Sequence, residues 1–403
     1  MDETTLSVKA MYEEYPYPTG GIMMRSGCDV NLLLSHVEIS RKTSGPMYAL
    51  DAGCGRGVGV IGAAMLQPNI QFIGADMNTT ALKDAKKTAE ERNINNVKFV
   101  EANLMTLEGI EVPPGGFDVI YSSGVLHHLS DPLVGLQNLE KILAPHGVIS
   151  LMLYGSYGRQ ALYRFIEGID ILMPDEKTIK ERLPYTRLMS QAAGQSLFKN
   201  NYWQDTDKVN DVEFVDRCLN VNEVSYDIDS LWELIDKADM HFIRWDNIAE
   251  WSIEHLFTAP HLLNKLRQLA PKDQFKIIER MFERPRLELL ISKKDNPRRL
   301  PVPINMIHKL NFSVTPEVSF SVEKRNLNGF QRIESISYKL KANESLRITD
   351  NAVAKAALLL VDQDRLFTGQ ELIFALKDNG LSQTDAINAL IKLLQLEIIY
   401  CPH

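Results

Sequence analysis

Short apolar runs alternate with helical patterns along the middle of the chain, from about residue 47 onward. The run at 47–50 leads into a glycine-rich turn, and a segment rich in Ala, Lys and Glu follows at 79–93. Apolar runs bounded by polar or turn residues predict buried strands, here at 47–50, 71–76, 97–100, 117–121 and 148–154. Strands that alternate with helices predict an α/β fold with a doubly wound sheet.

The alternation is interrupted after Tyr154 by a stretch of helical character that extends to about residue 225. It resumes with an amphipathic helix at 227–238 and apolar runs at 240–245 and 286–292. We therefore expect residues 156–225 to form a helical insertion at one edge of the sheet. Insertions at that edge commonly build a substrate pocket.

The end of the chain has a different pattern. The segment 296–303 carries three prolines and is expected to be a linker. Period-two alternation on both sides of Asn328-Gly329, at 318–322 and 336–340, predicts a β-hairpin. Helices are expected at 352–360, 369–377 and 384–394, with a capping box at Thr368-x-x-Glu371 and a short strand at 397–400.

This small α+β module resembles a winged helix. Winged helices often bind DNA, but the last predicted helix, 384–394, contains Lys392 as its one basic residue. We therefore favour contact with another protein, or self-association into a homodimer, over DNA binding. A module that stabilises the protein without binding any ligand is the alternative.

Composition narrows the class of protein. The chain has 403 residues, 45% hydrophobic and 24% charged, which is typical of a soluble globular protein with more than one core. A net charge of −8 gives no general attraction to nucleic acid, and the basic residues at 293–299 are interpreted as a solvated linker. The acidic N-terminus and the lack of a long apolar span predict neither a signal peptide nor a membrane helix, so we expect a cytoplasmic protein.

Four cysteines, Cys28, Cys54, Cys218 and Cys401, lie far apart in the sequence. No C-x-x-C pair is present, so we predict neither a zinc site nor a disulfide framework, and no metal.

The segment Asp51-Ala-Gly-Cys-Gly-Arg-Gly57 places three alternate glycines where a strand becomes a helix. Without a Cβ, the backbone of Gly53, Gly55 and Gly57 can touch a ligand, and the following helix directs free N–H groups at a negatively charged group. A dinucleotide motif needs a third glycine where this chain has Val58. Asp51 would repel a pyrophosphate but attract an ammonium group, so an amino-acid-bearing nucleoside fits better.

The next predicted strand ends at Asp76, where a carboxylate can accept both hydroxyls of a ribose. The loop after the fourth strand reads Ser122-Ser-Gly-Val-Leu-His-His-Leu-Ser-Asp-Pro132. The glycine turn, Asp76 and this loop together resemble the class I S-adenosylmethionine (SAM)-dependent methyltransferases. The resemblance implies a Rossmann-like seven-stranded sheet in which 286–292 is an antiparallel strand.

SAM as cofactor, with S-adenosylhomocysteine (SAH) as product, follows from that resemblance. The cofactor-binding positions it implies are Asp51, Gly53, Gly55, Gly57, Asp76, Met77, Asn103, Leu104, Ser122 and Gly124. Two positions depart from the family pattern. Asn103 stands where an Asp commonly receives the adenine amino group, and His146 replaces a glycine of the usual Pro-Gly-Gly turn, which we interpret as a neutral surface variation.

Further segments at 11–18, 153–159 and 224–226 resemble a group of bacterial methyltransferases of type 11/12, similar to protein lysine methyltransferases, with a helical insertion and an appended C-terminal domain. The domains expected on this basis are an N-terminal helical and aromatic cap at 1–46, a methyltransferase domain at 47–295 and a winged-helix-like domain at 296–403.

The same resemblance suggests residues for the acceptor side. Tyr12, Tyr15 and Tyr17 are expected to form either an aromatic lid on the cofactor or core filling. His127 or His128 is a candidate base, although packing or cofactor contact is favoured. Tyr154 and Arg159, at the acceptor entrance, are further catalytic candidates, and Tyr157 and Tyr226 are candidates for binding the acceptor, as are the three N-terminal tyrosines.

Methyl transfer requires mainly that a nucleophile be held in line with the S–CH₃ bond while water is excluded. We expect transfer to an N or O nucleophile, with a protein or peptide acceptor favoured over a metabolite or natural-product intermediate. A SAM-sensing protein without catalysis is the alternative from another class. An NAD-dependent oxidoreductase is disfavoured by Val58.

Overall fold

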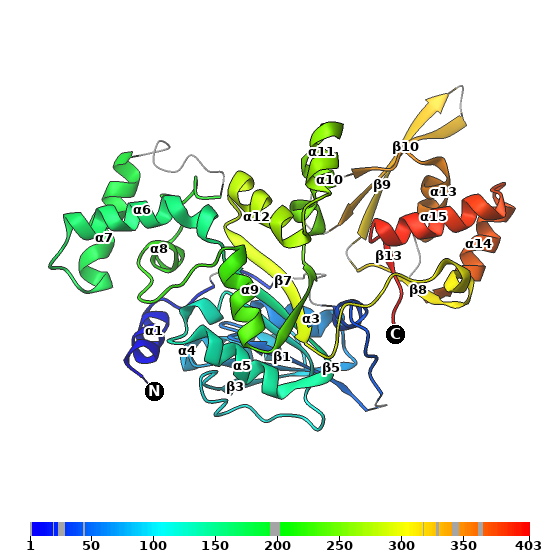
Figure 1. Ribbon diagram of the computed structural model, residues 1–403. Helices are drawn as coiled ribbons and strands as arrows, with labels where there is room; N and C mark the ends of the chain where they lie inside the picture. Colours follow the sequence, from blue (N-terminus) through cyan, green and yellow to red (C-terminus); the bar gives the residue numbers. More distant parts are fainter. Residues whose placement is uncertain are drawn as a thin grey trace. The chain divides into compact units, whose positions relative to one another are not determined.

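A computed structural model describes residues 2–18, 20–22, 29–42, 45–193, 202–316, 318–327, 330–340, 346–361 and 366–403. The chain folds into two compact units (Figure 1). The first comprises Met1–Met24 and Thr43–Pro297, and the second comprises Arg25–Lys42 and Arg298–His403. Cys28 and the predicted Asn328-Gly329 turn lie outside the described residues.

The first unit contains a seven-stranded sheet with the order β3-β2-β1-β4-β5-β7-β6. Its strands are β1 (Met47–Ala52), β2 (Ile70–Asp76), β3 (Val97–Glu101), β4 (Phe117–Ser123), β5 (Leu143–Tyr154), β6 (Met240–Trp245) and β7 (Arg286–Lys293). The first five strands pair in parallel, and β7 is antiparallel to both β5 and β6. The predicted strands and the antiparallel last strand are confirmed.

The sheet helices begin at residues that cap them. Asp131 accepts hydrogen bonds from Leu133 N (2.9 Å) and Val134 N (3.2 Å) and precedes a proline at the first position of α5. Asp227 and Ser230 form a capping box at the start of α9. The helices of the catalytic sheet are α3 (Val58–Leu66), α4 (Thr79–Glu91), α5 (Pro132–Ile142), α9 (Ile228–Lys237) and α12 (Pro271–Phe282), with short α10 (Ile253–Leu256) and α11 (Pro260–Leu266) between α9 and α12.

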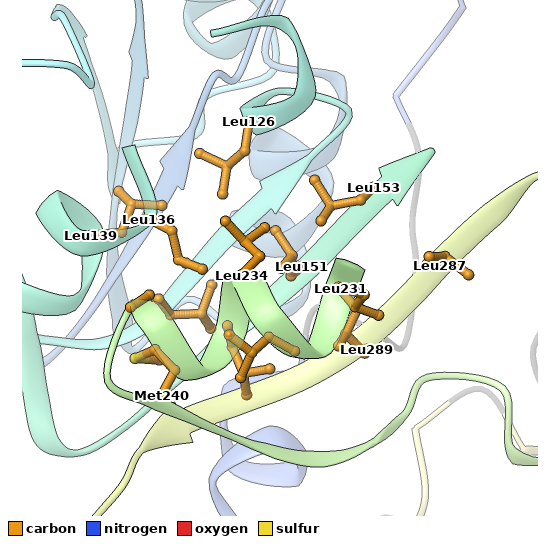
Figure 2. Packing of buried hydrophobic residues seen from close by; sticks show 14 of the residues in the cluster. Leu126, Leu136, Leu139, Leu151, Leu153, Leu231, Leu234, Met240, Leu287 and Leu289 are labelled. Atoms are coloured by element: carbon orange, nitrogen blue, oxygen red, sulfur yellow. The ribbon is translucent and has the colours of Figure 1, made fainter. Parts of the chain in front are cut away.

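One large core lies between the sheet and the helices α5 and α9. Figure 2 shows Leu231 and Leu234 of α9 beside Leu151 of β5 and Leu289 of β7. Burying apolar side chains stabilises the fold by about 25 cal/mol for each Å² of apolar surface removed from water. This core therefore fixes the sheet whose strand ends carry the candidate site.

Within residues 156–225, the described parts, 156–193 and 202–225, hold three helices: α6 (Ser156–Leu172), α7 (Ile179–Ala193) and α8 (Asp211–Cys218). Together with α1 (Glu3–Glu14) they enclose a second core that includes Met11, Leu162 and Phe214. The same N-terminal helix is tied to the sheet, because Lys9 Nζ lies 3.0 Å from Glu101 Oε1 at the end of β3. Helix α1 thus connects the insertion with the carboxyl ends of the strands.

His146 is not a neutral surface variation, contrary to expectation. Strand β5 already begins at Leu143, so His146 belongs to the strand, and its Nε2 lies 2.6 Å from Oδ1 of Asp118. Asp118 is buried in β4, and its Oδ2 accepts a hydrogen bond from Tyr48 N at 2.7 Å. The side chain therefore links β5 with β4 and β1.

The second unit combines a three-stranded sheet of order β12-β8-β13 with a second sheet, β11-β10-β9. Its elements are α2 (Val30–Leu34), β8 (Asn311–Val314), β9 (Val318–Leu327), β10 (Phe330–Leu340), β11 (Leu346–Arg347), α13 (Asn351–Leu360), β12 (Phe367–Thr368), α14 (Gly369–Asp378), α15 (Gln383–Gln395) and β13 (Ile399–Tyr400). The three helices predicted from the sequence and the capping box at Thr368 and Glu371 are confirmed.

Three cysteines, Cys54, Cys218 and Cys401, are buried free thiols. Among the residues that the structure describes, no helix has the length and apolar character to cross a membrane.

Candidate functional site

The glycine loop between β1 and α3 has a backbone that other residues cannot adopt freely. Gly53, Gly55 and Gly57 have φ values of +88°, +52° and +73°. A Cβ added to Gly53 would lie 2.3 Å from a methyl of Val125, and one added to Gly55 would lie 2.8 Å from the carbonyl oxygen of Tyr17. The loop therefore needs glycine both for its conformation and for close approach.

Asp76, at the end of β2, is held against this loop. Its Oδ2 accepts a hydrogen bond from Gly55 N (2.7 Å), and its Oδ1 accepts one from Asn78 N (2.8 Å). Burial raises the pKa of Asp76 despite these bonds. Each oxygen keeps a lone pair, so the carboxylate can still accept a pair of hydroxyl groups.

Asp51, at the end of β1, has no hydrogen-bond or ion-pair partner for its carboxylate among the described residues. Burial raises the pKa of Asp51 to about 7, and the charge of Asp76 contributes to the same shift. A buried carboxyl of this kind is stabilised in its ionised form by a cation placed beside it.

The other predicted cofactor positions follow β2, β3 and β4. Asn103 uses its Oδ1 to accept Met105 N at 2.9 Å, which leaves one lone pair on that oxygen. Met77 is half-buried beside Asp76, and Leu104 is buried. Ser122 is fully buried with its Oγ lacking a described partner, and Gly124 has φ +76°. The parallel topology brings all ten predicted positions to the carboxyl ends of adjacent strands.

His127 lies in a short helical turn, η2 (Leu126–His128), and is completely buried. Neither ring nitrogen has a hydrogen-bond partner among the described residues, and the ring stacks on Tyr154 with 3.8 Å between centroids. Burial lowers the pKa of His127 well below its ordinary value, and the neighbouring His128 adds to the shift. His127 is therefore a neutral packing residue under Tyr154.

His128 is buried but differently bonded. Its Nδ1 lies 2.8 Å from the carbonyl oxygen of Asn222, and the Asn222 side chain donates to the carbonyl oxygens of His128 and Leu129. Since a carbonyl only accepts, Nδ1 carries the proton. The Nε2 of His128 is buried without a partner in the described part of the chain.

Arg159, expected at the acceptor entrance, is almost fully buried. Its guanidinium donates to both oxygens of Glu223, at 2.8 and 2.7 Å, and Tyr163 donates to the same carboxylate at 2.7 Å. Its Cζ lies 3.7 Å from the centroid of the Tyr154 ring. The charge of Arg159 is therefore satisfied inside the protein by Glu223, and its guanidinium packs on the Tyr154 ring.

The predicted aromatic residues divide into two groups. Tyr12 donates a hydrogen bond to Asp216 (2.8 Å), Tyr15 packs on the insertion core, and Tyr17 is 38% exposed above Gly55. Tyr157 and Tyr226 lie elsewhere: Tyr157 beside the guanidinium of Arg280, at 4.8 Å, and Tyr226 in the main core, where its N–H donates to the carbonyl oxygen of Tyr154.

Three polar residues of the insertion, Asp216, Asn222 and Glu223, were missed from the sequence. No motif marks them. The one available signal was an acid on the buried side of the amphipathic helix α8, between Val215 and Cys218. Among the described residues, no group of three or more His, Cys, Asp and Glu side chains is arranged to hold a metal ion.

The strand order, the antiparallel β7 and the glycine loop define the class of protein. The chain carries a SAM-dependent methyltransferase domain with the class I fold. A protein-family profile described as a methyltransferase domain matches residues 44–205.

Individual relatives extend this assignment. An uncharacterized protein of Synechococcus sp. is 25% identical over 69% of this chain and 69% of its own length. The tRNA 5-carboxymethoxyuridine methyltransferase of Escherichia coli K12 is 33% identical over 28% of this chain, and the match spans 42% of that enzyme, under half of its length.

Among solved structures, PKMT2 from Rickettsia typhi in complex with AdoHcy has the same fold, with a TM-score of 0.70 at 18% identity. The match covers 96% of this chain and 77% of PKMT2.

Proposed function

We propose that this methyltransferase binds SAM at the carboxyl ends of β1 to β4 and methylates an N or O nucleophile of a protein or peptide. The sulfonium of SAM supplies the electrophilic methyl group. The protein has to bind the cofactor, orient the acceptor and exclude water.

The unpartnered carboxyl of Asp51 beside the glycine loop carries the cofactor proposal. It would hold the ammonium group of SAM, and the backbone of Gly53, Gly55 and Gly57 would lie against the methionine part. Asp76 would accept the ribose hydroxyls with the lone pairs left by Gly55 N and Asn78 N. Met77, Leu104 and the free lone pair of Asn103 would contact the adenine, with Ser122 and Gly124 beside the sulfonium.

Calorimetric titration tests this assignment. We expect Asp76→Ala to weaken SAM binding at least tenfold, while Asp273→Ala, which removes an exposed carboxylate from α12, leaves it unchanged. NAD is expected not to bind. Equal SAM affinity in Asp76→Ala and the parent protein would refute the site.

Two features support a macromolecular acceptor: the insertion beside the strand ends, and a second unit of interaction size. PKMT2 shares the fold over both regions. A small metabolite or natural-product intermediate is the alternative acceptor, and a SAM sensor without turnover is the alternative function.

Transfer of a radiolabelled methyl group from SAM into an extract of the source cell separates these outcomes, with Asp76→Ala as the control. Label retained with protein after separation by size supports the proposal. Label in the filtrate indicates a small acceptor, and SAM binding without any label indicates a sensor.

For the second unit we infer a winged-helix-like module that contacts a protein, either a partner or a second copy of this chain. Three helices, α13 to α15, packed with a small sheet and the hairpin β9–β10 support the comparison. Sedimentation of the full chain over a range of concentrations tests self-association, and a monomer at every concentration would refute the homodimer.

A further inference from the structure

A carboxylate that has no counter-ion among the described residues lies inside the insertion. Asp216 of α8 is 5% exposed, and its Oδ1 accepts a hydrogen bond from Tyr12. No described residue forms an ion pair with it, and two arginines of the insertion bind other carboxylates. Arg159 binds Glu223, and Arg217 binds Asp205 and Glu213. A buried charge that lacks a counter-ion costs free energy, which a cationic ligand would recover.

Two further unpartnered polar atoms lie in the same cluster of side chains. The ring of His128 is 5.6 Å from that of Tyr154 and 6.1 Å from that of Tyr12, which binds Asp216. With its proton on Nδ1, neutral His128 presents an acceptor lone pair at Nε2, and that atom is buried without a partner among the described residues.

The ring of Tyr154 packs against other side chains, whereas its hydroxyl has no partner among the described residues. Its ring is in contact with the imidazole of His127, at 3.8 Å, and with the guanidinium of Arg159, at 3.7 Å. Its hydroxyl forms no hydrogen bond with a described residue. Burial raises the pKa of Tyr154 well above its ordinary value, and the charge of Asp216 adds to this shift.

We propose that Asp216, His128 and Tyr154 form the acceptor subsite and bind the ammonium group of a primary amine. The inference rests on the proposed methyltransferase function and specifies its substrate class. The cluster offers a negative charge and several acceptor atoms, and a primary ammonium brings a positive charge and three N–H donors. An alcohol has one donor and no charge, and an acceptor carboxylate would be repelled by Asp216.

The cluster also provides for the proton that the acceptor must lose. The ammonium transfers one proton to Nε2 of His128, which leaves a neutral amine and an imidazolium. The amine lone pair then forms the N–C bond while the C–S bond breaks and its electron pair stays on sulfur. The products are a methylated ammonium and SAH, and the imidazolium releases its proton to water.

Binding of n-butylammonium to the protein saturated with SAH tests the subsite without any turnover. Ligand-observed saturation-transfer NMR gives the dissociation constants of n-butylammonium and of n-butanol, which has the same length but no charge. We expect n-butylammonium to bind at least tenfold more tightly, and Asp216→Asn to abolish that preference. Asp211→Asn makes the same change at the exposed start of the same helix and is expected to change the preference less than twofold.

The SAH affinity and melting temperature of each variant report whether it is folded, and the comparison of the two probes in the parent protein needs no variant. Equal binding of the two probes by the parent protein would overturn the inference, as would an unchanged preference in folded Asp216→Asn. Failure of the proposed function looks different, because the parent protein would then not bind SAH at all. If Asp216→Asn does not fold, the binding of the two probes by the parent protein decides whether the inference stands.

Discussion

Replacing Asp51 with Asn removes a charge without changing the size of the side chain, so it isolates the role of that charge in cofactor binding. The carboxyl has no partner among the described residues, and burial, with the charge of Asp76, raises its pKa to about 7. A charged hydrogen bond to a ligand ammonium contributes about 1.5 to 3 kcal/mol. At pH 8 we therefore expect Asp51→Asn to bind SAM about 10- to 100-fold more weakly than the parent protein.

The pH dependence follows from the same pKa. Below pH 7 an increasing fraction of Asp51 is protonated, and binding the ammonium then requires loss of that proton. The advantage of the parent protein over Asp51→Asn should fall by about tenfold between pH 8 and pH 6. Titration of the ligand itself is common to both proteins and cancels in this ratio.

Asp51→Asn should raise the stability of the ligand-free protein, although it lowers the affinity for SAM. A carboxyl whose pKa is higher in the folded than in the unfolded state costs stability as pH rises from about 4 to 7. Raising the pKa from 3.8 to about 7 corresponds to about 4 kcal/mol, which we halve because the side chain keeps some solvent contact. Ligand-free Asp51→Asn should therefore be about 2 kcal/mol more stable at pH 8.

Isothermal titration calorimetry at pH 6, 7 and 8, with denaturant unfolding of the ligand-free proteins, measures both effects. Parallel affinity profiles for the two proteins would refute the role of the charge. A less stable Asp51→Asn would show that the carboxylate is not strained in the absence of ligand.

Three other substitutions test contacts that position the site. His146→Ala leaves buried Asp118 without one partner, so the free energy of unfolding should fall by about 1 to 3 kcal/mol in denaturant titrations while SAH affinity is kept. Glu223→Ala leaves the buried guanidinium of Arg159 without its carboxylate partner. We expect the free energy of unfolding to fall by about 3 to 5 kcal/mol in the same titrations, and a fall of under 1 kcal/mol would contradict the buried ion pair. Gly53→Ala forces a Cβ into an occupied space at φ +88°, so calorimetry should detect no SAM binding at concentrations that saturate the parent protein.

The glycine loop and Asp76 could be predicted because the pattern that indicates them lies within one continuous stretch of the sequence. A strand, a turn with three glycines and a helix follow one another without interruption, and the next strand end is fixed by one crossover. Parallel pairing then brings both strand ends to one edge of the sheet whatever the rest of the chain does. The same reasoning located β4, Ser122 and Gly124.

The acceptor side could not be predicted in this way, because it depends on pairs far apart in the sequence. Arg159 and Glu223 are 64 residues apart, and Tyr12 and Asp216 are 204 apart. The position of Arg159 after β5 indicated the correct edge of the sheet. Whether its charge faced a ligand or an internal carboxylate depended on Glu223, which no local pattern places beside it.

The N-terminal segment contacts both halves of the site. The carbonyl oxygen of Tyr12 accepts a hydrogen bond from Asn78, which caps the helix after Asp76, and its hydroxyl binds Asp216 and accepts from Asn220. The carbonyl of Tyr17 lies against Gly55. A substitution that displaced this segment would therefore weaken cofactor and acceptor binding together. Loss of the amine preference with SAH affinity intact can only come from the acceptor cluster itself, which is why the two affinities have to be measured on the same protein.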